Sequence, residues 1–267
     1  MRRLLIIYPT LIFSMIFGFG WRSDNQGTLQ INELNQPAQI TPQPIVQEMI
    51  GQVNQERALT DLKRLTGVEP ICLNGQCYSI TGRETGSEGL QWAKDYVYET
   101  LVSLHYSVEV MDWSRDGYED QNILAYKPGL LYPDEEIYFI AHLDGYLADN
   151  PAADDDASGA VSLLELARVL SDRTLSRSVV IFFSTGEEYG SLGSRQFVEQ
   201  YPKRLESIKY MVSVEMLGYD SNNDGKMQLW SGDPVIYPSS FVFTQMLSEI
   251  ISAYPVNLIP QIVTGCT

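Results

Sequence analysis

Apolar and polar positions alternate in a regular series of predicted strands and helices through the second half of the chain. Apolar strands are predicted at 136–141, 178–184 and 209–214, with helices at 158–170 and 192–201 between them. This order is typical of an α/β domain in which helices cover both faces of the sheet. The predicted fold class is therefore α/β, with a mostly parallel mixed sheet sandwiched by helices.

Further elements flank this series on both sides. Residues 86–105 carry apolar positions at helical spacing, and Thr85 and Ser87 precede them as candidate caps. Four shorter elements and one more helix complete the pattern: strands at 107–113, 122–126, 228–230 and 258–263, and a helix at 241–254. One globular domain, residues 49–267, is expected to contain all of them.

The N-terminal residues have a different pattern. Met1–Arg3 is positively charged, and an apolar run from Leu4 to Trp21 follows, which is typical of an export signal over residues 1–22. An uncleaved membrane anchor is the alternative, because no clean small-x-small cleavage site precedes Arg22. Residues 23–48, rich in Gln, Asn, Pro and Thr, are predicted to be a flexible linker.

The charge balance limits the partners of the protein. The formal net charge is −16 over 267 residues, whereas binding nucleic acid requires a clustered Lys/Arg surface. Nucleic acid is therefore excluded as a partner, and a membrane is a partner only if the N-terminal segment is an anchor. A secreted or periplasmic location suits this composition.

The chain has three cysteines. Cys72 and Cys77 enclose a short turn and are expected to form a disulfide in an exported protein; two free thiols are the alternative. Cys266 has no partner nearby in the sequence.

Polar clusters follow the three apolar strands of the series. Residues 142–144 follow the first strand, residues 186–188 the second and Glu215 the third, while three aspartates at 154–156 precede the 158–170 helix. Because parallel strands end at the same edge of a sheet, these clusters are expected to converge on one pocket.

Each cluster also has a purely structural interpretation. A histidine at the end of a strand is commonly hydrogen-bonded within the fold, and acidic residues before a helix can cap it or complement its dipole. Carboxylates that converge, however, repel one another and raise one another's pKa unless a multivalent cation neutralises them. A mixed set of imidazole and carboxylates favours zinc over calcium or magnesium.

Four motifs together resemble a known family. They are Ala-His-Leu-Asp-Gly at 141–145, Ala-Asp-Asp-Asp-Ala-Ser-Gly at 153–159, Ser-Thr-Gly-Glu-Glu-Tyr-Gly-Ser-Leu-Gly-Ser at 184–194 and Val-Glu-Met-Leu-Gly-Tyr at 214–219. In type and order they are similar to the di-zinc metallopeptidases that include secreted bacterial leucyl aminopeptidases and glutamate carboxypeptidase, to which glutaminyl cyclase is related. The resemblance begins at about Thr81, where Gly82–Ser87 is similar to the start of the family's first domain helix.

The resemblance implies a role for each polar residue. His142 and Glu215 would bind one zinc, Glu188 would bind the second, and Asp155 would bridge the two. Asp144 would hold the imidazole of His142 in one tautomer. Glu215 stands where many members of the family carry aspartate, so the site must be slightly roomier.

The resemblance to the family also implies a catalytic role for Glu187. Glu187 would be the general base that takes a proton from water and passes it to the leaving amine. The implied activity is that of a zinc-dependent exopeptidase acting on peptides, an aminopeptidase first and a carboxypeptidase of the same fold second. A glutaminyl cyclase-like transferase and a non-catalytic domain that has lost its metals are the alternatives.

The family's last metal ligand has no counterpart in the chain. The resemblance implies a further histidine within an aspartate–histidine pair, just after a short-range cysteine pair, but Cys266 is single. The only other histidine, His105, is expected near the end of the 86–105 helix as a surface or packing residue. Without that ligand the second zinc would be held only by Asp155, Glu188 and water, so we expect a weak second site and a chain that ends inside the motif.

Overall fold

The computed structural model describes residues 40–265 of the chain. The predicted signal or anchor at 1–22, most of the predicted linker and Cys266 lie outside the described residues. The described part divides into two compact units, one of residues 52–219 and one of residues 40–51 and 220–265. The hydropathy pattern, in contrast, predicts a single domain. None of the described helices is long and apolar enough to cross a membrane.

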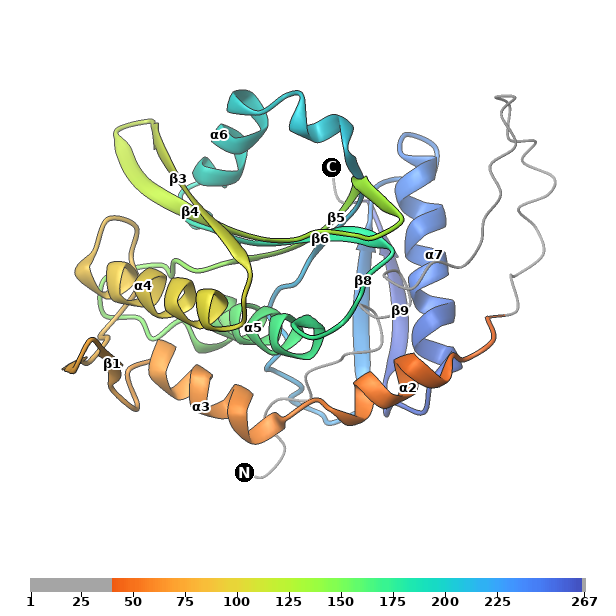
Figure 1. Ribbon diagram of the computed structural model, residues 1–267, viewed down its shortest axis with the longest axis horizontal. Coiled ribbons are helices and arrows are strands. Elements are labelled where there is room, and N and C mark those ends of the chain that lie inside the picture. The colour runs from red at the N-terminus through yellow and green to blue at the C-terminus, as the bar shows by residue number, and fades with distance from the viewer. Residues whose placement is uncertain (1–39, 266–267) are drawn as a thin grey trace. The chain divides into compact units, whose positions relative to one another are not determined.

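A five-stranded mixed sheet forms the centre of the first unit (Figure 1). Its strands are β3 (Ser107–Arg115), β4 (Tyr118–Lys127), β5 (Tyr132–His142), β6 (Arg177–Ser184) and β7 (Ile208–Ser213), in the order β3-β4-β6-β5-β7. β5 pairs in parallel with β6 and β7, whereas β4 is antiparallel to both β3 and β6. The predicted α/β class is confirmed, but parallel pairing holds for only one half of the sheet.

The antiparallel half begins with a tight hairpin. Asp116 and Gly117 connect β3 to β4, with φ angles of 53° and 86°. Two consecutive residues with positive φ match the twist of a two-residue β-hairpin, and the Asp-Gly pair favours this turn. The turn therefore fixes the register in which Arg115 pairs with Tyr118.

Helices cover both faces of this sheet. In Figure 1, α6 (Leu192–Gln200) lies on one face, and α3 (Gln55–Leu65), α4 (Glu88–Ser103) and α5 (Gly159–Leu170) lie on the other. Ser87 caps α4 by accepting a hydrogen bond from the amide of Leu90 at 3.2 Å, as its position predicts. His105 lies beyond the end of α4 with φ of 66°, so its expected place within the helix is wrong.

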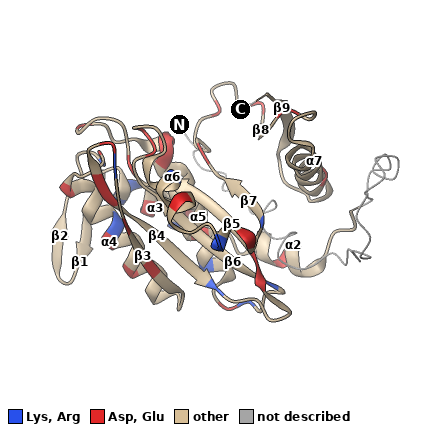
Figure 2. Ribbon diagram, turned by 90° about the horizontal axis from the view of Figure 1, so that it is seen from above, with Lys and Arg blue, Asp and Glu red and all other residues tan. Residues whose placement is uncertain are grey.

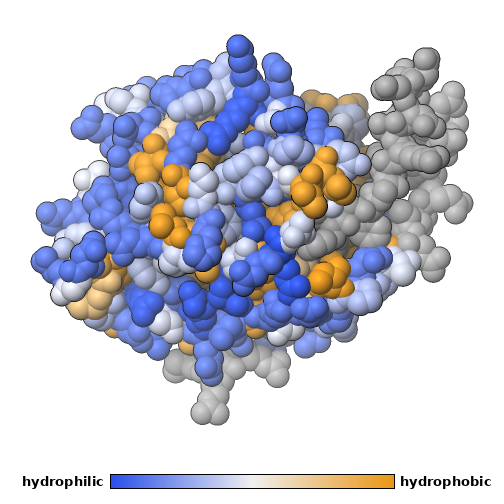
Figure 3. Space-filling view, viewed as in Figure 1, coloured by the Kyte–Doolittle hydropathy of each residue, from blue (hydrophilic) through white to orange (hydrophobic). Residues whose placement is uncertain are grey.

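The sheet and its helices enclose an apolar core. Every residue of β6 from Ser178 onwards is buried, as is every residue of α5 except Arg168. Burying side chains such as Phe182 and Phe197 contributes roughly 1.5–3 kcal/mol each, which holds the strand ends in fixed positions. On the face seen in Figure 3, hydrophobic residues reach the surface only in separate patches.

The second unit has a small sheet of its own. β8 (Lys226–Ser231) and β9 (Ile259–Thr264) pair in parallel, and α7 (Pro238–Ala253) connects them along the chain. Helix α2 (Pro44–Gly51) begins inside the predicted linker, because Val46 and Met49 provide an apolar face that is buried. The last residues of the segment predicted to be a flexible linker are therefore helical.

A disulfide closes a two-stranded ribbon before α4. β1 (Ile71–Leu73) and β2 (Gln76–Tyr78) are antiparallel, and Cys72 pairs with Cys77 in their register. The two sulfur atoms are bonded, which confirms the predicted bridge.

We expect replacement of both cysteines by serine to lower the free energy of unfolding by about 2 kcal/mol, because the closed loop is short. Chemical denaturation of the double variant measures this loss. The control is the unaltered protein with reductant, whose free energy of unfolding should fall by the same amount. A fall of more than about 4 kcal/mol would contradict the view that the disulfide acts only by closing a short loop.

Candidate metal centre

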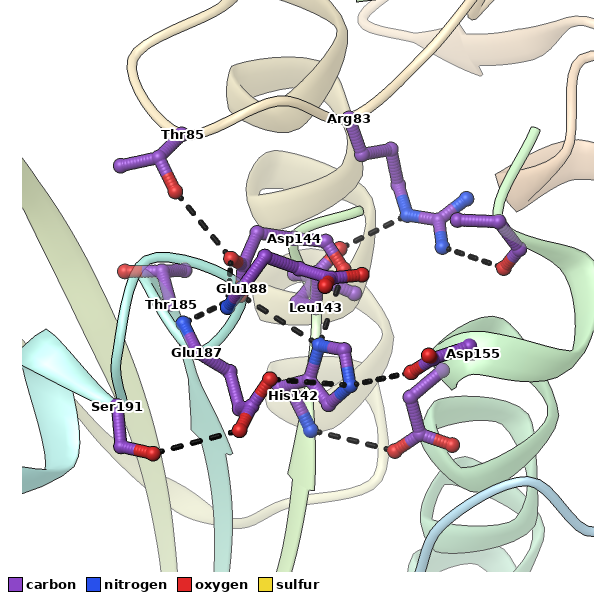
Figure 4. A network of polar contacts seen from close by, with 12 residues as sticks. Arg83, Thr85, His142, Leu143, Asp144, Asp155, Thr185, Glu187, Glu188 and Ser191 are labelled. Carbon is purple, nitrogen blue, oxygen red and sulfur yellow. Dashed lines mark hydrogen bonds and ion pairs between the residues drawn. The ribbon is translucent and has the colours of Figure 1, made fainter. Parts of the chain in front are cut away.

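The predicted polar clusters converge at the carboxyl ends of the parallel strands, as expected (Figure 4). His142 is the last residue of β5, Glu187 and Glu188 follow the end of β6, and Glu215 follows the end of β7. Asp155 comes from the turn Ala153–Ser158 that precedes α5. Segments separated by more than seventy residues therefore supply one cluster.

The Nε2 atom of His142 is the centre of this cluster. It lies 2.9 Å from Oδ1 of Asp155, 3.7 Å from Oε1 of Glu215 and 4.0 Å from Oε2 of Glu187. The imidazole is buried, while the three carboxylates are between one third and one half exposed. The cluster is thus open to solvent on the carboxylate side.

The other ring nitrogen of His142 faces Asp144. Nδ1 lies 3.1 Å from the backbone carbonyl of Asp144 and 3.6 Å from its carboxylate. A proton on Nδ1 can be donated to that carbonyl, which leaves Nε2 free to bind a metal. The orienting role expected of Asp144 stays a prediction, and the atom of Asp144 that lies nearest to Nδ1 is the backbone oxygen.

The carboxylate of Asp144 has a different set of partners. It is fully buried and accepts hydrogen bonds from the amide of Glu187 at 3.2 Å, the amide of Glu188 at 3.3 Å and the hydroxyl of Thr85 at 3.2 Å. These bonds tie the loop after β6 to the end of β5. Asp144 therefore positions Glu187 and Glu188 as well as His142.

The three consecutive aspartates have separate functions. Asp156 is buried and accepts bonds from the amides of His142, Gly159 and Met216, and Asp154 accepts one from the amide of Gly218 at 2.7 Å. Both carboxylates therefore bind backbone amides, as expected if these aspartates have a structural role. Of the three, only Asp155 has its carboxylate beside Nε2 of His142.

Arg83 is a residue of the site that the motif analysis does not single out. Its side chain is completely buried and donates to the carbonyls of Leu143 at 2.8 Å, Pro151 at 2.8 Å and Ala152 at 2.9 Å. Burial lowers its pKa to about 10, although the negative charges of Asp144 and Asp156 act to raise it. The only signal in the sequence is its place within the Gly82–Ser87 motif.

Electrostatics raise the pKa of three groups in the cluster. Burial alone would lower the pKa of His142, but the hydrogen bond to Asp144 and the nearby carboxylate charges raise it to about 10. Burial raises the pKa of Glu188 and of Glu215, and repulsion from neighbouring carboxylates adds to both increases. Acidic residues outnumber basic ones, 34 to 18, and in Figure 2 the red acidic segments are more extensive than the blue basic ones.

The donor atoms fit a zinc ion. Two overlapping groups each bring one imidazole nitrogen and two carboxylate oxygens within 4.8 Å of one another: His142 with Glu187 and Glu215, and His142 with Asp155 and Glu188. This mixed set is the chemistry that zinc prefers. The first group differs from the expected one, because it joins Glu187 to His142 and Glu215. The resemblance instead implies that Asp155 shares a zinc with these two residues.

We expect zinc binding to release protons at pH 7, because His142 is protonated in the metal-free centre and must be neutral to bind metal. The apparent affinity for zinc should therefore rise with pH up to about 10. Calorimetry in two buffers of different ionisation enthalpy measures the release, with about one proton or more expected per zinc. His142→Gln is the control, and equal heats in both buffers for the unaltered protein would contradict the prediction.

The mixed sheet between helices and the histidine–carboxylate centre at its strand ends define the class of zinc exopeptidase-like α/β domains. Residues 122–249 match the sequence profile of Peptidase family M28, so the chain is similar to this family over that range. The predicted resemblance to di-zinc metallopeptidases is confirmed.

Individual proteins are similar to the chain in sequence or in fold. "Leucine aminopeptidase 1" of Pyrenophora teres f. teres is 31% identical over 199 residues, which are 68% of this chain and 49% of the relative. The chain is similar in fold to LapB from Legionella pneumophila (TM-score 0.69, 19% identity, 88% of this chain and 63% of that one). It is also similar to glutaminyl cyclase from Macrostomum lignano (TM-score 0.61, 16% identity, 88% and 79%). The chain spans about half the length of that first relative.

Proposed function

We propose that the protein is a zinc-dependent exopeptidase, and specifically an aminopeptidase that removes N-terminal residues from peptides. The observation that carries this proposal is the convergence of four carboxylates around one buried histidine, in a chain that matches the profile of Peptidase family M28 over residues 122–249. The leucine aminopeptidases among the relatives support aminopeptidase over carboxypeptidase activity.

His142, Asp155, Glu188 and Glu215 would hold the metal. When bound, zinc would acidify a water molecule and polarise the scissile carbonyl. Asp144 keeps Nε2 of His142 directed at the centre through the contact at Nδ1. Its carboxylate fixes the backbone of Glu188, so the ligands need little rearrangement.

Glu187 is proposed as the general base. Its carboxylate lies 4.0 Å from Nε2 of His142, and the hydroxyl of Ser191 donates to it at 3.3 Å. It would take one proton from the attacking water and give that proton to the departing nitrogen as the C–N bond breaks. Its backbone amide is bonded to Asp144, which fixes the loop from which the carboxylate extends.

We expect a chelator to abolish hydrolysis of an aminoacyl anilide and added zinc to restore it, because the centre offers the substrate no other electrophile. The assay uses the protein as its source encodes it, with an N-acetylated anilide as the control for the free amine. Two other results would overturn the proposal: cyclisation of N-terminal glutamine without hydrolysis indicates a transferase, and zinc binding without turnover of any peptide indicates a binding domain.

Export is part of the proposal. The charged and apolar N-terminal residues support a secreted or periplasmic location, and so does the bond between Cys72 and Cys77, since disulfides persist in oxidising compartments. Cell fractionation after expression in a bacterium tests it. Recovery of the protein only in the cytosol would contradict it.

A further inference from the structure

A second pocket lies between helix α4 and the ribbon of β1 and β2, which are neighbours in Figures 1 and 2. Its volume is about 480 Å³, within the range of roughly 300–1,000 Å³ that is typical of ligand pockets. The described residues that line it lie between 73 and 78 on the ribbon and between 91 and 99 on α4, and none of them belongs to the metal centre. We call this cavity the ribbon pocket.

Contacts between the ribbon and α4 hold the walls of the ribbon pocket in place. Tyr78 of β2 stacks on Trp92 of α4, with ring centroids 4.8 Å apart and an angle of 26° between the rings. Asn74, in the turn between β1 and β2, donates from Nδ2 to Oε1 of Glu99 at 3.2 Å. The disulfide of the ribbon closes the segment that contains Asn74. The pocket is therefore formed before a ligand arrives, which lowers the free-energy cost of binding.

Helix α4 contributes one face to the ribbon pocket. The lining residues of this helix recur at intervals of three and four positions, which places them on one side of it: Gln91, Trp92, Asp95, Tyr98 and Glu99. This face combines aromatic rings with two carboxylates, and the side chain of Tyr98 is 40% exposed. Aromatic faces and carboxylates both attract cations.

The two carboxylates of the ribbon pocket are bonded to neutral donors. Oδ1 of Asp95 accepts a hydrogen bond from Nε2 of Gln91 at 2.9 Å, and the donor to Glu99 is also a side-chain amide. Lys94, which is adjacent in the sequence, is buried and forms an ion pair with Asp120 instead. None of the described lining residues is basic. Because like charges one helical turn apart destabilise a helix, a cation bound beside both carboxylates would relieve their repulsion.

We propose that the ribbon pocket binds the side chain of an arginine residue from a peptide. The guanidinium group is a planar cation that stacks on aromatic rings and donates in fixed directions to carboxylates. Trp92 and Tyr98 would therefore contact its faces, and Asp95 and Glu99 would accept its N–H groups. The ammonium group of lysine is compact and more strongly hydrated, so it suits stacked rings less well. This binding site is additional to the proposed peptidase activity and does not depend on it.

The test titrates N-acetyl-arginine amide and N-acetyl-citrulline amide into the zinc-loaded protein. Citrulline has nearly the same shape without the charge, and neither probe offers a free terminus to an exopeptidase. Binding is followed by NMR through the indole N–H signal of Trp92, which is assigned by its absence from Trp92→Phe. We expect the arginine probe to bind about fivefold more tightly than the citrulline probe. This preference should shrink as the salt concentration rises.

Charge-neutral variants identify the groups responsible. Asp95→Asn and Glu99→Gln should each weaken binding of the arginine probe about threefold and leave that of the citrulline probe within about twofold. Glu88→Gln is the matched control, because Glu88 is exposed at the start of α4 and does not line the pocket, and it should change neither affinity.

Three results would overturn the proposal: equal binding of the two probes, no saturable change in the Trp92 signal, or an equal loss in Glu88→Gln. Maltotriose that binds more tightly than the arginine probe would also overturn it and indicate a saccharide pocket. A preference for arginine in a protein that hydrolyses no peptide would support the ribbon pocket and contradict only the peptidase.

Discussion

Glu187→Gln is expected to lower the turnover of an aminoacyl anilide by several orders of magnitude and to leave the zinc content nearly unchanged. The substitution is almost isosteric and removes only the group that accepts and returns the proton. Turnover and metal content are measured on the same preparation of the protein as its source encodes it. The backbone bond from residue 187 to Asp144 does not involve the side chain, so the loop should keep its position.

Two further variants give this experiment its reference points. Glu215→Asp supplies the residue that many members of the family carry, and it should keep both zinc and activity within about tenfold. Glu188→Gln should lose zinc together with activity, because a neutral amide is a poor ligand for the metal. If Glu187→Gln kept more than about a tenth of the activity, or lost zinc as Glu188→Gln does, Glu187 would be a ligand and not the base.

Arg83→Met is expected to cost about 3–5 kcal/mol of the free energy of unfolding, which is a large part of the stability of a typical domain. The guanidinium is completely buried and donates to the carbonyls of Leu65, Leu143, Pro151 and Ala152. Methionine fills similar volume but leaves these acceptors unsatisfied. Because Leu143 lies between His142 and Asp144, zinc affinity should fall as well.

Chemical denaturation and zinc titration of the Arg83 variant measure the two effects. Arg195→Met is the matched control, since Arg195 is exposed on α6, and it should change the stability by less than about 0.5 kcal/mol. Arg83→Lys keeps the charge with fewer donors and should fall between the two. A loss below about 1 kcal/mol for Arg83→Met would mean that the four carbonyls find other partners.

The sequence by itself determined the strand–helix series and the place of each polar cluster along it. Apolar periodicity records which face of an element is buried, and that is a local property, so the strands ending at His142 and Ser184 and helix α5 lie where the pattern predicts them. The tight turn at Asp116 and Gly117 is also encoded locally, but the apolar pattern predicts only separate strands at 107–113 and 122–126 and not this hairpin. The assignment to di-zinc metallopeptidases also needed only four short motifs in order.

Only the tertiary structure decided how these elements combine. The strand order β3-β4-β6-β5-β7 and the division into two units depend on contacts between residues far apart in the chain, which periodicity does not record. The same is true of polar partners. The carboxylate of Asp144 bonds to amides more than forty residues away, and Arg83 bonds to carbonyls on three separate segments. Backbone bonds also distinguish the three adjacent aspartates: the carboxylates of Asp154 and Asp156 accept from amides, whereas that of Asp155 lies beside Nε2 of His142.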